Sequence, residues 1–151
     1  MNLDQYNWKD ILNAMPDMIS LLDEEHRILW INDNMANTLG ISRDKCVGEY
    51  CYKLVHNTNE PPDFCPYFKF LKDKAPHSVE VFLAKLDKEY LVTVSPIRVS
   101  GSKILGAIHI ARDITEVKRQ QKELLSYREE KVLSEAMEGI SKSLKEGTFV
   151  K

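Results

Sequence analysis

The side chains best suited to chemistry are concentrated in residues 46–65. This stretch holds Cys46, Cys51 and His56, and a proline-rich loop then leads to Cys65. Three cysteines are an odd number, so they do not predict the disulfide framework of a secreted domain. The loop could bring Cys51 and Cys65 together as a redox pair. Cys65 precedes a predicted helix, whose N-terminus would lower the pKa of its thiol.

Metal binding and plain packing are the alternatives for the same residues. Cys46, Cys51, His56 and Cys65 are all metal-ligand types, but their spacings of 5, 5 and 9 residues match no closed zinc template. We therefore predict no metal site. Buried free cysteines that behave as small apolar side chains remain an alternative to the redox pair.

His109 is the other chemically interesting residue. It lies in the run 103–111, where Leu105, Ala107, His109 and Ala111 alternate with an apolar set on the opposite side. Two neighbouring alanines would leave room for a ligand beside the imidazole. A core histidine satisfied by a hydrogen bond is the interpretation that we favour. His26 and His77 flank predicted turns, where we expect them to be solvated.

Composition excludes several classes of function. The chain has 151 residues, 43% of them hydrophobic and 29% charged, with a net charge of −2 and no basic stripe. We therefore expect a globular protein that does not bind nucleic acid. No apolar run approaches the roughly 20 residues needed to cross a bilayer, and the N-terminus lacks the layout of a signal peptide. The expected location is the cytoplasm.

No catalytic set is visible. The six glycines are scattered and form no phosphate-binding loop. No histidine follows His109, so the phosphoacceptor helix of a histidine kinase is absent from this segment. We predict that the segment is not an enzyme.

The secondary structure that would position these residues follows from apolar periodicity, prolines and glycines. Asn32 or Asp33 should cap one helix, Gly40 should end it, and Ser42 should begin another short one. The run 103–111 is apolar on both sides, which predicts a central strand covered on both faces. The predicted elements are a helix at 4–14, a hairpin of strands 18–23 and 26–32, a helix at 33–39, an irregular segment at 48–66, a helix at 66–74, and a meander of strands 78–86, 89–99 and 103–111 with turns at 87–88 and 100–102.

A long charged helix is predicted after residue 114. It contains two apolar sets with three-four spacing that do not share one heptad register. Such a weakly apolar seam is unstable alone, which favours a homodimer through the terminal helices over a solvated helix packed on its own domain. The two sets are Ile114, Val117, Gln121 and Leu124, followed by Leu133, Met137, Ile140 and Leu144.

The order of elements and two motifs resemble the sensory PAS domain family. The motifs are MPDMISLLDEEHRILWINDNMANTLG near the start and GAIHIARDITEVKRQQKEL near the end. The resemblance implies an α+β fold, a five-stranded antiparallel sheet with helices on one face. It divides the chain into an N-terminal helix at 1–14, a sensor domain at 15–115 and a C-terminal signalling helix at 116–151. It also implies a partner output domain such as a histidine kinase.

The resemblance leaves the cofactor unknown. Gly48, Cys51 and Leu54 match the Gly-x-x-Cys-x-x-Leu frame of flavin-binding PAS photosensors. The polar residues that read the flavin in those proteins are replaced, here by Tyr50, Tyr52, Val55, Tyr90 and Ala111. Haem-binding members draw a histidine from the longer helix, which contains none here. Neither flavin nor haem is favoured. The segments CYKLVH and PPDFCP are also similar to PAS domains of anaerobes.

The resemblance predicts where a ligand pocket and a signal relay would lie. The main hypothesis is a sensor that detects a small ligand or a redox change and relays it to an output domain. The alternatives are a ligand-free dimerisation module and a Cys51–Cys65 thiol switch. Asp113, Ile114 and Thr115 form the predicted relay. The predicted pocket residues are Cys51, Tyr52, Leu54, Phe68, Leu71, Phe82, Val92, Ala107 and His109.

Overall fold

The computed structural model describes residues 5–99 and 103–147. It separates into two compact units, 1–114 and 115–151. The predicted turn at 100–102 lies outside the described residues. The strands are β1 (Met18–Leu22), β2 (Ile28–Ile31), β3 (His77–Leu83), β4 (Lys88–Arg98) and β5 (Ile104–Asp113). The helices are α1 (Trp8–Asn13), α2 (Asp33–Leu39), α3 (Arg43–Cys46), α4 (Cys51–His56), α5 (Pro66–Asp73) and α6 (Thr115–Lys145).

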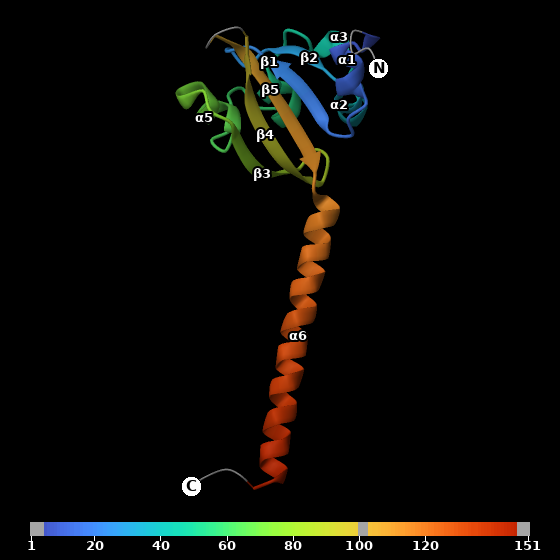
Figure 1. The fold of residues 1–151 in the computed structure, drawn as a ribbon, viewed down its shortest axis with the longest axis vertical. Coiled ribbons are helices and arrows are strands. Elements are labelled where there is room, and N and C mark those ends of the chain that lie inside the picture. The colour runs from blue at the N-terminus through green and yellow to red at the C-terminus, as the bar shows by residue number, and fades with distance from the viewer. Residues whose placement is uncertain (1–4, 100–102, 148–151) are drawn as a thin grey trace. The chain divides into compact units, whose positions relative to one another are not determined.

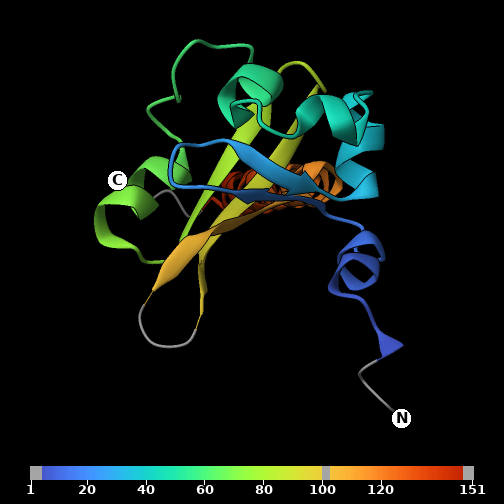
Figure 2. The same cartoon turned by 90° about the horizontal axis from the view of Figure 1, so that it is seen from above.

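The first unit is built on one antiparallel sheet with the strand order β2-β1-β5-β4-β3 (Figure 1). The predicted central position of the last strand is confirmed, because β5 pairs with β1 on one side and β4 on the other. The helices between residues 33 and 56 lie together on one side of the strands (Figure 2). The core, which includes Leu22, Ile31, Phe70 and Val94, is on this side.

Both sides of β5 are less protected than the sequence predicts. Ala107 is fully buried, but His109 and Ala111 on the same side keep intermediate exposure, as do Ile108 and Ile110 on the other side. Both faces of this strand are therefore partly covered within this unit, rather than fully covered as the sequence predicts. Periodicity shows that a side chain is apolar, but it does not show what covers it.

Local signals set the helix ends. Asn32 caps α2 by accepting a hydrogen bond from the Met35 amide at 3.0 Å, and Gly40 ends the helix in the left-handed conformation with φ of 65°. Pro66 occupies the first turn of α5, as predicted. The segment 48–66 is not irregular throughout, because α4 occupies 51–56. Its six residues are too short to show a clear helical period.

His26 corrects one expectation of the sequence. It is 7% exposed rather than solvated, and its ring packs on Tyr67 with 4.4 Å between the ring centroids. The residue has φ of 66°, a left-handed turn conformation that histidine adopts more readily than most residues do. That conformation turns the ring inward between α4 and α5. His77 instead bonds Asp73 near the surface, with 2.8 Å between nitrogen and oxygen.

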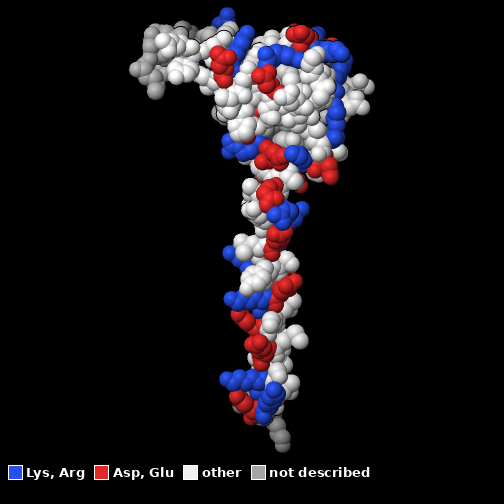
Figure 3. Space-filling view, turned by 90° about the vertical axis from the view of Figure 1, so that its right-hand side faces the viewer, with Lys and Arg blue, Asp and Glu red and all other residues white. Residues whose placement is uncertain are grey.

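The second unit is α6, whose 31 residues carry interspersed charges (Figure 3). None of its described residues is buried. Its apolar side chains are more than half exposed, with Leu124 at 51%, Leu133 at 64% and Met137 at 70%. In the part of the chain that the structure describes, no helix is both long and apolar enough to cross a membrane.

Candidate functional site

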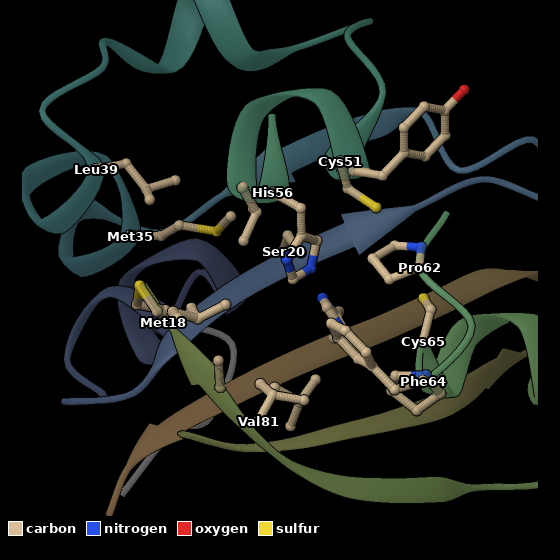
Figure 4. A pocket seen from close by; sticks show the side chains of 17 residues that line it. Met18, Ser20, Met35, Leu39, Cys51, His56, Pro62, Phe64, Cys65 and Val81 are labelled. Atoms are coloured by element: carbon tan, nitrogen blue, oxygen red, sulfur yellow. The ribbon is translucent and has the colours of Figure 1, made fainter. Parts of the chain in front are cut away.

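A cavity lies between the sheet and the helical side of the first unit (Figure 4). Strands supply its floor, and the segment 51–66, from α4 to the start of α5, supplies much of its wall. The lining residues are Met18, Ser20, Met35, Leu39, Cys51, Tyr52, Val55, His56, Pro62, Phe64, Cys65, Pro66, Val81, Leu83, Val92, His109 and Ala111. The CYKLVH and PPDFCP segments, at residues 51–56 and 61–66, therefore line the same site.

The cavity is small. The centre of a water-sized sphere can occupy about 40 Å³ inside it. The space that a ligand could fill extends beyond those centres, so the cavity suits a few waters or a ligand of a few non-hydrogen atoms. A haem or an isoalloxazine ring would need a substantial rearrangement of the walls.

Two polar groups in the cavity have no partner. Among the described residues, neither Ser20 Oγ nor His109 Nε2 finds a hydrogen bond, and both atoms are shielded from solvent. Ser20 is 1% exposed and pairs directly with His109 in the register of β1 and β5. Directly opposed residues in antiparallel strands have Cβ atoms about 4.5–5.5 Å apart. Both unpaired groups therefore belong to one small region of the cavity floor.

The imidazole of His109 is held neutral. Burial, followed by the nearby His56 and His26, lowers the pKa of His109 to about 4. Burial also lowers the pKa of His56, which faces the same cavity (Figure 4). A neutral imidazole presents one donor nitrogen and one acceptor nitrogen. The site thus offers hydrogen bonds without a fixed charge.

The thiols of Cys51 and Cys65 both face this cavity (Figure 4). Both are free and buried. Burial, with Cys65 nearby, raises the pKa of Cys51 to about 12, and burial also raises the pKa of Cys65. The expectation of a lowered pKa for Cys65 is therefore wrong, because desolvation outweighs the backbone amides of Tyr67 and Phe68 at the start of α5.

Cys46 is buried in the core outside the cavity lining, and burial raises the pKa of its thiol too. Within the described ranges no three or more histidine, cysteine or carboxylate side chains are grouped closely enough to hold a metal ion. The cysteines and His56 therefore do not converge on one ligation point.

The structure brings four of the predicted pocket residues to the cavity. Cys51, Tyr52, Val92 and His109 line it, and the remaining predictions do not coincide with its lining. Leu54 borders a separate groove, which it shares with Ile41 and Lys85. Ala107 is buried in the core, and Leu71 is partly buried against it.

Phe82 and Phe68 were placed in the pocket wrongly. Phe82 is 55% exposed, because neighbouring residues of a strand point to opposite faces and its neighbours Val81 and Leu83 take the core side. Phe68 is 47% exposed, because Tyr67 and Phe70 occupy the buried side of α5. A bulky apolar side chain on a helix or strand beside the cavity does not by itself show that the side chain faces the cavity.

Sequence reasoning missed Ser20 and His56 as cavity residues. A single serine within the apolar run of residues 18–22 was the available signal, because a buried polar side chain needs a partner. His56 could have been found from α4, where it follows Tyr52 at four-residue spacing on one helical face.

The end of β5 is held by ion pairs on both sides. Arg112 pairs with Asp17, just before β1, at 3.0 Å, and the Asp17 side chain is 8% exposed. Asp113 pairs with Lys88 of β4 at 2.6 Å. The next residue, Ile114, donates its amide to the Glu89 carbonyl at 2.9 Å. The predicted relay thus begins at a well-tethered strand end.

The sequence profile of the PAS domain family matches residues 16–116, about two thirds of the chain. This chain belongs to the PAS domain family. No curated protein matches it significantly. The sensor fold predicted from the sequence is therefore confirmed.

Solved PAS domains share this fold. The PAS domain of nitrogen regulation protein NR(II) from Vibrio parahaemolyticus is 20% identical, with a TM-score of 0.56 over 76% of this chain and 100% of that one. The PAS domain of Bordetella pertussis BvgS is 21% identical, with a TM-score of 0.52 over 80% and 94% of the two chains. The photoactive yellow protein domain of the sensor histidine kinase Ppr from Rhodospirillum centenum is 12% identical, with a TM-score of 0.56 over 73% and 95%.

Proposed function

We propose that this PAS domain is a cytoplasmic sensory module that detects a small ligand in its cavity and relays binding to an output domain, such as a histidine kinase. The observation that carries the proposal is the pair of Ser20 Oγ and His109 Nε2, which lack a hydrogen-bond partner among the described residues, inside a largely apolar cavity. Buried polar groups are normally paired, so an unpaired pair marks a position for a ligand or water. The module itself performs no catalysis.

The proposed route of the signal is β5. His109 and Ala111 line the cavity, and Asp113, Ile114 and Thr115 follow directly in the chain, where α6 begins. A ligand can shift the junction only if it favours one packing of β5 over another. The ion pairs of Arg112 and Asp113 would then differ between the two packings.

Filling the cavity tests the relay without a known ligand. Ala111→Leu adds apolar volume inside the cavity, and we expect it to change the hydrogen exchange of the amides at 115–123. Ala84→Leu is the matched control, because Ala84 is exposed in the turn between β3 and β4. Equal exchange in the two variants, with circular dichroism showing both folded, would reject the relay.

A second substitution examines the junction itself. Asp113→Ala removes the ion pair with Lys88. Combined with Ala111→Leu, it should abolish the change in exchange at 115–123. If the change persists in the double variant, Asp113 takes no part in the relay.

A dimerisation module without a ligand is the second candidate. It is favoured by the exposed apolar residues of α6, including Leu133, Met137 and Ile140. Such residues need a partner surface, and a second copy of the same helix is the simplest one. On the face shown in Figure 3, acidic and basic side chains are interspersed, which does not favour nucleic acid as the partner.

The Cys51–Cys65 thiol switch is supported by the shared cavity but opposed by the raised pKa values of both thiols. The thiolate is the reactive form, so we expect slow modification by a thiol reagent at pH 8 in the folded protein and fast modification in urea. Rapid modification of one cavity cysteine in the folded protein would instead support the thiol-switch hypothesis.

A further inference from the structure

We propose that the cavity binds a short-chain alcohol whose hydroxyl group bridges Ser20 and His109. This proposal rests on the proposed function, because it takes the cavity to be the ligand site. The ligand is a neutral molecule of about three to five non-hydrogen atoms, with its alkyl part on the apolar walls.

The first argument is the pair of unsatisfied groups. Ser20 Oγ and His109 Nε2 are shielded from solvent and lack a partner among the described residues. An unpaired buried polar group costs desolvation free energy. A ligand that forms hydrogen bonds with both groups therefore offsets this cost at each of them. Since the two residues oppose each other across β1 and β5, their side chains start from neighbouring points of the cavity floor, where we expect one small polar group to reach both.

The second argument concerns charge. The lining contains no aspartate, glutamate, lysine or arginine. Burial keeps His109 neutral at pH 7 and also disfavours the charged form of His56. A carboxylate or an ammonium ion would lose its hydration without meeting an opposite charge, which is unfavourable. The cavity therefore selects a neutral molecule.

The third argument distinguishes a hydroxyl from other neutral groups. Ser20 can donate or accept a hydrogen bond, and His109 Nε2 donates in one neutral tautomer and accepts in the other. A hydroxyl both donates and accepts, so it completes the bridge for either tautomer. A ketone only accepts, and it therefore needs both side chains as donors.

The fourth argument is size and wall chemistry. The centre of a water-sized sphere can occupy only about 40 Å³ inside the cavity, which leaves room for a small ligand but not for a large one. Apart from Ser20, His109 and His56, the walls are largely apolar, with Met18, Met35 and Val81 facing the same space (Figure 4). A chain of two to four carbons would contact these side chains. So few contacts give an affinity of roughly millimolar Kd.

The test is an NMR titration of the whole 151-residue chain with 1-propanol. We expect saturable shifts of the cavity methyl groups and of the His109 ring. Ser20→Ala should weaken binding about two- to tenfold, because it removes one hydrogen bond. Ser78→Ala is the matched control and should leave the affinity unchanged, because Ser78 bonds Thr93 in an exposed pair at the other face of the sheet.

Acetone, propionate, propylammonium and xenon complete the set of probes. Stronger binding of propionate or propylammonium would overturn the claim of neutrality. Stronger binding of xenon or acetone, or equal weakening by the two serine substitutions, would overturn the hydroxyl bridge. No shift with 1-propanol up to about 100 mM would overturn the proposal altogether.

These failures are distinguishable from failure of the proposed function. The Ala111→Leu exchange experiment needs no ligand, so it can support the relay even if no alcohol binds. Conversely, saturable propanol binding without any change in exchange at 115–123 would support the ligand class and reject the relay.

Discussion

Asn32 organises the backbone around the start of the sheet. Its side-chain oxygen accepts from the amides of Ile19 and Met35, both at 3.0 Å. Its side-chain nitrogen donates to the carbonyls of Leu12 and Asp17 at 3.1 and 2.9 Å. One fully buried amide thereby joins α1, β1 and α2. The residue acts as a structural anchor as well as a helix cap.

Asn32→Ala should therefore destabilise the fold strongly. It leaves several buried backbone groups unpaired at about 1–3 kcal/mol each, so we expect a loss of about 3 kcal/mol or more in the free energy of unfolding. Urea denaturation measures this loss. Asn37→Ala, on the exposed side of the same helix, should change it by less than about 0.5 kcal/mol. Similar losses in both variants would contradict the anchoring role.

His109 makes a second prediction at this scale, on the pH dependence of stability. Burial lowers its pKa to about 4 from an ordinary value of 6.5. Above pH 6.5 the histidine is neutral in both states, and its contribution to stability is complete. Between pH 6.5 and 4 the unfolded chain binds the proton first, so the free energy of unfolding falls, by up to about 3 kcal/mol from this group.

Urea denaturation at several pH values between 7.5 and 4.5 follows this loss. His109→Gln does not titrate and should show a smaller fall over the same range, whatever its stability at pH 7.5. Carboxylates that titrate near pH 4.5 contribute equally to both proteins. Identical pH slopes for the two proteins would show that His109 is not held neutral.

At the scale of the elements, β5 depends on a close approach to the end of β1. Gly106 has φ of 151°, and a Cβ atom built there would lie 2.2 Å from the carbonyl oxygen of Leu22. Backbone atoms cannot move aside as a flexible side chain can. Gly106 is thus required where the central strand passes its neighbour.

We expect Gly106→Ala to destabilise the sheet by about 2 kcal/mol or more. Gly139→Ala is the contrasting substitution, because a Cβ there meets nothing within 4 Å. It lies inside α6 and should raise helix stability by about 1 kcal/mol. Thermal unfolding followed by circular dichroism reports both. A harmless Gly106→Ala would mean that β5 can move away from Leu22.

The elements also show what sequence reasoning could and could not reach. Alternation, caps and glycines gave the strands and most helices, because these signals are local. The cavity depends on which side of each element faces the helices. Phe68 and Phe82 were assigned to it wrongly, since apolar character does not fix that direction. Ser20 was missed because its significance appears only when β1 is paired with β5.

At the scale of the whole molecule, α6 is the element that most needs a partner. Its exposed residues Leu133 and Met137 lie four residues apart on one side of the helix. We predict a dimer through this surface. The double variant Leu133→Gln/Met137→Gln should shift the protein towards the monomer by at least tenfold in Kd, measured by sedimentation.

The control for this prediction is the double variant Lys131→Gln/Glu135→Gln. It also introduces two glutamines into α6, but at other positions. Lys131 and Glu135 form an exposed pair at 3.9 Å and leave the apolar side intact. Such a pair contributes little, so the dimer should persist. Equal dissociation in both double variants, or a monomeric parent protein, would contradict the prediction.

The two ion pairs at the end of β5 have a consequence for motion. Arg112 and Asp113 are consecutive, so they point to opposite faces of the sheet, and each is tied to a different neighbouring segment. If the strand end rotates about its own axis in either direction, one of the two ion pairs lengthens. Since salt screens exposed charges more than buried ones, we expect rising ionic strength to weaken the Lys88–Asp113 pair more than the Arg112–Asp17 pair, whose aspartate is 8% exposed.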